Sequence, residues 1–161
     1  MNINKPLIAI TMGDPCGVGP EVIVTALTDP DIRAVCKPLV LGDRRAMQRA
    51  LTVCNSQLEL VTVSSPAEAA DLLDSVIPLL ELSSLADIDI VYGKPSELAG
   101  DAVYRYIRRA AELCLTGEVA AMATAPICKE AMHRAGHHYP GHTELLAELC
   151  RCDQFVMMLA G

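Results

Sequence analysis

The chain has 161 residues, which suits one domain with a hydrophobic core of its own. Its net charge is −7, its basic residues are scattered, and it has one Phe and no Trp, a composition that excludes nucleic acid as a main partner. Hydrophobic residues make up 52% of the sequence, but no apolar run reaches the roughly 18–20 residues of a membrane-spanning helix, which argues against a membrane partner.

The first half of the chain alternates short apolar runs with helical patterns. Residues 6–11 form an apolar run that predicts a buried strand. A helix is expected over 19–27, because Pro20 and Glu21 suit the first helical turn. The elements expected next are a strand at 37–43, a helix at 44–54 capped by Asp43, a strand at 58–63 and a helix at 65–75.

Residues 76–100 do not give one clear pattern. Residues 76–82 fit a strand or an irregular segment, and residues 87–96 resemble a strand that runs into a loop. The pattern then becomes clear again. The elements expected are a helix at 100–116, a strand at 119–126, a helix at 128–135 closed by Gly136, a helix at 144–150 capped by Thr143, and a final strand at 154–161.

Strands that alternate with helices predict a parallel sheet covered on both faces, and so a three-layer α/β/α fold over residues 1–161. The first residues lack the features of a signal peptide, and a soluble cytoplasmic protein is expected. The seven cysteines include no C-x-x-C pair and are interpreted as mostly buried thiols. The large apolar fraction indicates a buried interface between subunits, and the final apolar strand suggests the first part of a longer chain.

A glycine-rich segment, TMGDPCGVGPE, follows the first predicted strand. A strand, a turn and a helix start can aim backbone N–H groups at an anion. The segment is neither a P-loop nor a dinucleotide fingerprint, because it lacks the Gly-Lys-Ser/Thr sequence and the third glycine. Two interpretations stay open: a tight turn that needs positive φ at Gly13, Gly17 or Gly19, and a ligand loop with Asp14 at the carboxyl end of a parallel strand.

A second candidate segment surrounds Lys129, which with Thr124 flanks a predicted strand-to-helix turn. If the predicted topology holds, this turn lies at the same edge of the sheet as Asp14. A lysine beside a helix start can hold a phosphate or transfer a proton. The alternative is an ordinary solvated lysine on a helix.

All four histidines lie within ten residues of one another. His133 and His137 are four apart, but Gly136 interrupts the helix and no Glu follows His133, so a metal site built from histidines is not expected. His142 is the better candidate, because with Thr143 it lies at the positive end of a predicted helix, which suits a phosphate ester. The other three are interpreted as solvated or structural, and replacing His137 is expected to have little effect.

Three segments carry a resemblance to a known family: ITMGDPCGVGPE, GEVAAMATAPICKEAM and AGHHYPGHTELLAE. In this order and separation they resemble the 4-hydroxythreonine-4-phosphate dehydrogenase family of vitamin B6 synthesis. The resemblance covers essentially all 161 residues and corresponds to the amino-terminal half of the family's usual chain.

The resemblance implies a fold similar to isocitrate and isopropylmalate dehydrogenases, with two α/β/α lobes, a cleft between them, and a homodimer. It implies oxidation of a secondary alcohol in a phosphorylated hydroxy acid by NAD or NADP, after which the oxo acid loses carbon dioxide. It also implies a divalent metal (zinc, magnesium or cobalt) that polarises the alcohol oxygen.

In the family's GHTE motif the histidine and the threonine contact the substrate, which implies substrate-binding roles for His142 and Thr143. The family's metal-binding histidines and most of its nicotinamide surface belong to the other half, so this chain is expected to hold no metal ligand. Two residues depart from the family: Cys16 stands where a smaller residue is usual, and Cys128 replaces Asn or His beside Lys129, the candidate catalytic residue.

The leading expectation is metal-dependent NAD(P) oxidation of 4-phosphohydroxy-L-threonine. A second possibility keeps the mechanism and takes D-threonate or D-erythronate 4-phosphate as substrate. A third, from another class, is a non-catalytic fragment that binds a phosphate ester. The dehydrogenase reading requires that the Gly-Asp-Pro and Gly-His-Thr turns do not lie at opposite ends of the sheet, and that the imidazole of His142 is not turned into the interior.

Overall fold

The structure, a computed structural model, describes residues 5–73 and 75–159. Five strands form one sheet in the order β3-β4-β2-β1-β5, and every neighbouring pair is parallel. This confirms the predicted parallel sheet. The strands are β1 (Leu7–Thr11), β2 (Lys37–Asp43), β3 (Glu59–Val63), β4 (Val76–Ser83) and β5 (Ala121–Thr124).

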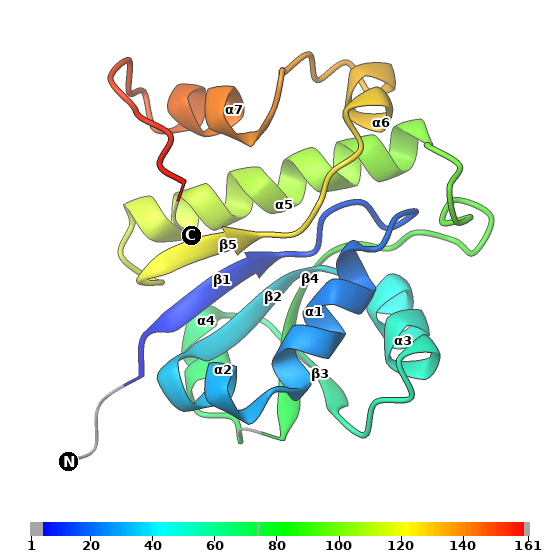
Figure 1. Ribbon diagram of the computed structural model, residues 1–161, viewed down its shortest axis with the longest axis vertical. Coiled ribbons are helices and arrows are strands. Elements are labelled where there is room, and N and C mark those ends of the chain that lie inside the picture. Colours follow the sequence, from blue (N-terminus) through cyan, green and yellow to red (C-terminus); the bar gives the residue numbers. More distant parts are fainter. Residues whose placement is uncertain (1–4, 74, 160–161) are drawn as a thin grey trace.

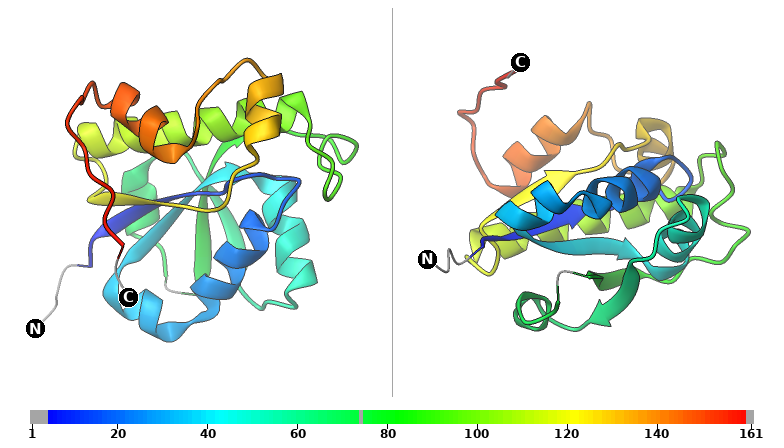
Figure 2. Two further views of the ribbon diagram at one scale, coloured as in Figure 1. Left: turned by 45° about the horizontal axis from the view of Figure 1, so that its top comes forward. Right: turned by 60° about the horizontal axis from the view of Figure 1, so that its bottom comes forward.

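Helices cover both faces of the sheet, which gives the predicted three layers (Figures 1 and 2). Helices α1 and α3 lie on one face, α4 and α5 lie on the other, and α6 and α7 pack along α5. The helices are α1 (Gly19–Thr28), α2 (Pro30–Val35), α3 (Arg44–Val53), α4 (Pro66–Ala70), α5 (Glu97–Leu115), α6 (Lys129–Arg134) and α7 (His142–Leu149).

The core forms where the central strands are covered from both sides. Strands β2 and β4 read as nearly continuous apolar runs, as expected of parallel strands that have helices on each face. Leu39, Leu41, Ile77 and Leu79 are fully buried within one hydrophobic cluster that also takes in residues of α1, α3 and α5. Among the described residues, no helix combines the length and the hydropathy needed to cross a membrane.

Apolar surface is exposed away from this core, around the edge strand β5. Of its four residues, Ala121, Ala123 and Thr124 are exposed. Beside them, side chains of β1, α1 and β5 line an open apolar groove. Beyond α7 the chain from Phe155 to Leu159 is exposed, although all five residues are hydrophobic. Exposed apolar surface of this kind is typical of a contact surface.

Three predicted elements differ from the structure, and one helix was not predicted. Residues 87–96 form turns rather than a strand, with the backbone N–H of Lys94 donating to the carbonyl of Val91 at 3.1 Å. Residues 154–159 are not a strand, because no described strand pairs with them; 160–161 lie outside the described residues. Helix α2 was not predicted, and α4 is shorter than the expected 65–75. Residues 76–82, left open, belong to strand β4.

Candidate functional site

The loops that follow β1 and β5 meet at the carboxyl edge of the sheet. The backbone N–H of Asp14 donates to the carbonyl of Pro126 at 3.0 Å, and that of Ala125 donates to the carbonyl of Thr11 at 3.1 Å. The two sequence segments with Asp14 and Lys129 therefore lie at one edge of the sheet, as the topology predicted. This is the edge at which open α/β sheets bind their ligands.

The loop after β1 is shaped largely by its own contacts. Gly13 has φ +73°, which satisfies the tight-turn interpretation, whereas Gly17 and Gly19 do not have positive φ. The carboxylate of Asp14 is buried and accepts a hydrogen bond from the backbone N–H of Cys16 at 2.9 Å. Burial raises the pKa of Asp14, and this hydrogen bond opposes the rise. Asp14 thus stabilises its own turn, and the turn needs no ligand to account for its form.

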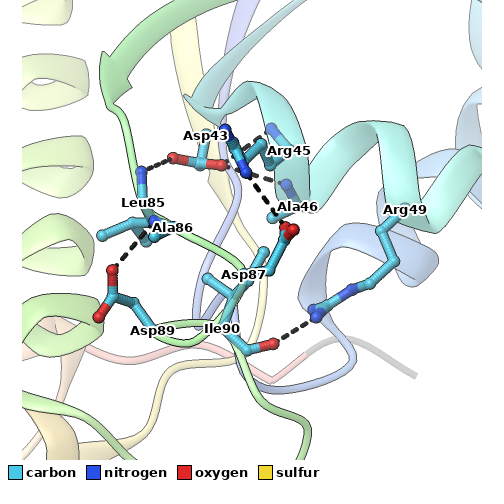
Figure 3. A network of polar contacts seen from close by, with 9 residues as sticks. All are labelled: Asp43, Arg45, Ala46, Arg49, Leu85, Ala86, Asp87, Asp89 and Ile90. Carbon is cyan, nitrogen blue, oxygen red and sulfur yellow. Dashed lines mark hydrogen bonds and ion pairs between the residues drawn. The ribbon is translucent and has the colours of Figure 1, made fainter.

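Residues 84–96 cover this loop, and Arg49 of α3 joins the two. Figure 3 shows the Arg49 side chain reaching Ile90 of the covering segment. The guanidinium of Arg49 donates to the carbonyls of Pro15, at 2.7 Å, and of Ile90, and it lies over the ring of Tyr92 at 3.8 Å from the ring centre. The Tyr92 hydroxyl in turn donates to Glu21 at the start of α1. Arg49 was not singled out from the sequence, where it has the pattern of a solvated helical residue.

Asp43 is the N-cap of α3, as predicted, and it also holds the start of the covering segment (Figure 3). One carboxylate oxygen accepts from the backbone N–H groups of Arg45 and Ala46, at 2.9 and 3.1 Å. The other accepts from the Ser83 hydroxyl and from the backbone N–H of Leu85, both at 2.9 Å. Asp43 is fully buried and both of its carboxylate oxygens accept hydrogen bonds, as expected of a carboxylate with a structural role.

Cys16 lies in the loop after β1, and its thiol is buried beneath the covering segment, residues 84–96. Its side chain is 1% exposed, and its Sγ lies 3.3 Å from the carbonyl of Asp89, to which it donates. Burial raises the pKa of Cys16 to about 11, and the nearby carboxylate of Asp14 adds to the rise. The thiol form therefore predominates at neutral pH.

We expect Cys16 to resist alkylation in the folded protein. At pH 8 a thiol with a pKa of about 11 is roughly one-thousandth thiolate, and only the thiolate reacts. Cys150 and Cys152 are exposed and should react with iodoacetamide first. Mass spectrometry of tryptic peptides over a time course measures the order. Alkylation of Cys16 as fast as that of Cys150 in the folded protein would contradict both its burial and its raised pKa.

Lys129 is the first residue of α6 and is exposed. The residue before it, Cys128, is the N-cap of this short helix but makes no side-chain capping hydrogen bond. The structure therefore places Lys129 at the same edge as Asp14, with its side chain in solvent. Its position is compatible with both interpretations drawn from the sequence.

His142 and Thr143 are the first two residues of α7. The prediction that Thr143 is the N-cap was wrong, because Gly141 is the N-cap. The backbone is extended at Gly141 and becomes helical at His142, two residues before the predicted start at Glu144. Thr143 therefore lies inside the first turn. The His142 ring is half-buried, so the requirement drawn from the sequence, that this imidazole is not turned into the interior, is met only for part of the ring. Its Nε2 is buried without a hydrogen-bond partner among the described residues. Burial lowers the pKa of His142, so that the neutral imidazole predominates at pH 7.

The other three histidines lie in or next to the segment between α6 and α7. His137 Nε2 is 3.1 Å from a carboxylate oxygen of Asp101, and its ring stacks on Tyr104. His133 and His138 face each other with ring centres 5.4 Å apart. Within the described residues, no three His, Cys, Asp or Glu side chains are arranged to hold a metal ion.

Comparison with known proteins identifies relatives over the whole chain. A family model described as pyridoxal phosphate biosynthetic protein PdxA matches residues 34–161. A 4-hydroxythreonine-4-phosphate dehydrogenase of Trichlorobacter lovleyi is 89% identical over 161 residues, which is 100% of this chain and 48% of that protein. A D-threonate 4-phosphate dehydrogenase of Cupriavidus necator is 44% identical over 156 residues, 97% of this chain and 46% of that protein.

Solved structures agree with this similarity. The crystal structure of a 4-hydroxythreonine-4-phosphate dehydrogenase from Burkholderia phymatum matches with a TM-score of 0.86 and 40% identity, over 93% of this chain and 45% of that chain. One from Klebsiella pneumoniae matches with a TM-score of 0.82 and 42% identity, over 91% and 45%. The chain thus spans about half the length of the relatives it matches.

Proposed function

The chain belongs to the PdxA family of pyridoxal phosphate biosynthetic proteins, and from this premise we propose that residues 1–161 are the amino-terminal part of a dehydrogenase that oxidises 4-phosphohydroxy-L-threonine with NAD or NADP. The oxo acid formed then loses carbon dioxide. The observation that carries the proposal is the 89% identity, over all 161 residues, to a 4-hydroxythreonine-4-phosphate dehydrogenase.

The proposed role of His142 and Thr143 is to bind the substrate phosphate ester. Both lie in the first turn of α7, where backbone N–H groups are free to face an anion. The buried Nε2 of His142 has no partner among the described residues, and an unpaired buried nitrogen costs free energy that a bound ligand would recover. The lowered pKa keeps this imidazole neutral near pH 7, so that it can donate one hydrogen bond and accept another.

The residues at the sheet edge complete the proposal. Lys129 is the candidate for proton transfer or for a second contact to the ester, and its exposed position leaves it accessible. Gly13 and Asp14 form the neighbouring turn. We assign them the role of shaping this side of the site, because the polar groups of Asp14 already bind the backbone of Cys16 and Pro126.

The residues present do not fit a divalent metal. The part of the chain that the structure describes holds no cluster of three metal-binding side chains, so no step through zinc, magnesium or cobalt is assigned to it. The proposed cofactor, NAD or NADP, follows from the dehydrogenase family alone. A cytoplasmic homodimer also belongs to the proposal, and the exposed apolar surface at β5 and at Phe155–Leu159 supports a further protein contact.

Parallel assays separate the three candidate substrates. The 44% identity to a D-threonate 4-phosphate dehydrogenase favours D-threonate or D-erythronate 4-phosphate as the second candidate. The protein is mixed with NAD or NADP, a divalent metal and one of the three compounds, and nicotinamide reduction is followed by absorbance. Turnover of 4-phosphohydroxy-L-threonine at the highest kcat/KM supports the first proposal. Preference for either sugar acid would replace it.

A phosphate-ester-binding fragment without catalysis is the candidate from another class. It is favoured by the absence of a metal cluster among the described residues and by the half-length match to the relatives. Calorimetric titration with 4-phosphohydroxy-L-threonine, run beside the absorbance assay, distinguishes the classes. Binding without turnover identifies a binding fragment, whereas the lack of both rules out a substrate site in the isolated chain.

We expect His142→Ala to weaken binding of 4-phosphohydroxy-L-threonine by about 1–3 kcal/mol, or roughly 5- to 150-fold in Kd, because a hydrogen bond to a charged ester is lost. His138→Ala is the matched control, since His138 is exposed. Calorimetry on the two variants and the unchanged chain gives the comparison. Equal losses in both variants would remove His142 from the proposed site.

A further inference from the structure

The segment between α6 and α7 ends at the two proposed substrate-binding residues, and one histidine fixes it to α5. His137 Nε2 lies 3.1 Å from a carboxylate oxygen of Asp101. Its ring stacks on Tyr104, one turn along α5, with ring centres 3.9 Å apart and an interplanar angle of 10°. Its backbone N–H donates to the carbonyl of Met132 in α6 at 2.9 Å. His137 therefore binds the segment to two helices through three separate contacts.

The far side of the segment is joined to α7 itself. The ring of Tyr139 lies parallel to that of Tyr104, with centres 6.4 Å apart, and its hydroxyl donates to Glu148 at 2.9 Å. The carbonyl of Tyr139 lies 3.2 Å from the Nε2 of His133. Three aromatic rings, of His137, Tyr104 and Tyr139, thus connect α5 to α7 across the segment that leads into His142.

We infer that His137 is a positioning residue: with Asp101 and Tyr104 it fixes the path of residues 137–141 and thereby the orientation of the His142 ring. The inference rests on the proposed function only for the consequence that substrate binding depends on it. It departs from the expectation drawn from the sequence that replacing His137 has little effect, because Asp101 on α5 supplies a partner for its imidazole.

The contacts of His137 indicate that it orients the His142 ring rather than stabilises the fold. The His137 side chain is 21% exposed, but the Asp101 side chain that it faces is 45% exposed, and a hydrogen bond to a carboxylate so open to solvent adds little to the free energy of unfolding. Helix α7 is anchored independently, because Leu145 is fully buried against Val103 and Ile107 of α5. Loss of His137 should therefore free the segment and leave the packing of α7 in place.

The chain supplies its own matched control, because His138 is adjacent and exposed, and its ring lies beside that of His133, with centres 5.4 Å apart, rather than on α5. Variants His137→Ala and His138→Ala are compared with the unchanged chain by proton–nitrogen NMR of the imidazole side chains. Four histidines give few enough signals to assign by the variants themselves. We expect His137→Ala to shift or broaden the His142 signals, and His138→Ala to leave them unchanged.

The expected Tm of both variants is close to that of the unchanged chain, which separates positioning from unfolding. His142 signals that are the same in His137→Ala as in the unchanged chain would overturn the inference. Equal changes in both variants would overturn it as well. If His137→Ala does not fold, Asp101→Asn, which alters the partner on α5 and keeps its size, is measured in its place with the same criteria.

A second measurement tests the consequence for binding. Calorimetric titration with 4-phosphohydroxy-L-threonine should show a loss of roughly 2- to 12-fold in affinity for His137→Ala, the scale of one weakened hydrogen bond from His142. His137→Phe, which keeps the ring stack on Tyr104, should recover part of this loss. If the unchanged chain does not bind the compound, the proposed substrate site in the isolated chain fails, while the NMR comparison, made without ligand, still decides the positioning role.

Discussion

Asp43→Ala is expected to lower the free energy of unfolding by about 3–5 kcal/mol, because it leaves buried hydrogen-bond donors without an acceptor. The side chain has no exposed surface. It caps α3 through the N–H groups of Arg45 and Ala46, and it accepts from Ser83 and Leu85 forty residues further along the chain. The loss of the cap alone costs about 1 kcal/mol. Urea unfolding followed by circular dichroism measures the change.

Asp87→Ala is the control from the same region. Its carboxylate is 3.4 Å from the guanidinium of Arg45, but its side chain is 86% exposed, so the free energy of unfolding should change by no more than about 0.5 kcal/mol. If Asp43→Ala does not fold, Asp43→Asn, which keeps one acceptor oxygen, should give an intermediate loss. An Asp43→Ala variant as stable as Asp87→Ala would show that these hydrogen bonds contribute nothing net.

Asp43 also shows which parts of the fold the sequence could predict. Its capping role depends on residues two and three positions ahead, and local patterns of this kind also located β1, β2, α1 and α3. Its contacts with Ser83 and Leu85 depend on β2 and β4 being neighbours in the sheet. Strand order is a property of the whole chain, so these contacts could not be predicted from spacing.

The difficulty of predicting residues 76–100 from the sequence has a similar physical cause. Strand β4 lies between β2 and β3 although its sequence contains Pro78, which has no N–H to donate to the sheet and made a central strand hard to predict. Residues 87–96 have the apolar alternation of a strand, but Ile90 is buried in the main hydrophobic cluster while Ile88, two residues earlier, is exposed. The contacts with Arg49 and Cys16, both distant in sequence, decide this conformation.

The positions of the candidate residues were predicted where they follow from topology and helix ends. The meeting of the Asp14 and Lys129 segments follows from parallel strands having their carboxyl ends at one edge, and the place of His142 follows from a helix start. The role of Thr143 as a cap was wrong by two residues, a typical error at helix ends. The contacts of His137 could not be predicted, since α5 packs beside α6 only in the folded chain.

The contact between the two site loops should be sensitive to a single methyl group at Gly13. A Cβ there would lie 2.3 Å from the carbonyl oxygen of Pro126 and 3.0 Å from the backbone of Ala125, and neither is the end of a flexible side chain. Gly13→Ala should therefore cost about 1–2 kcal/mol for the left-handed φ of +73° and about 1–3 kcal/mol more for the displaced backbone. Urea unfolding gives the sum.

Gly117→Ala separates these two costs. Gly117 has φ +75°, nearly the same as Gly13, but a Cβ there would meet nothing within 4 Å. This variant should lose only the conformational part, about 1–2 kcal/mol. The difference between the variants then measures how tightly the loop after β1 is packed on the loop after β5. Faster amide hydrogen exchange at Asp14 in Gly13→Ala alone would locate the change, because the N–H of Asp14 donates to Pro126. Equal losses in the two variants would mean that the loops yield without cost, in which case they could not fix the relative positions of Asp14 and Lys129.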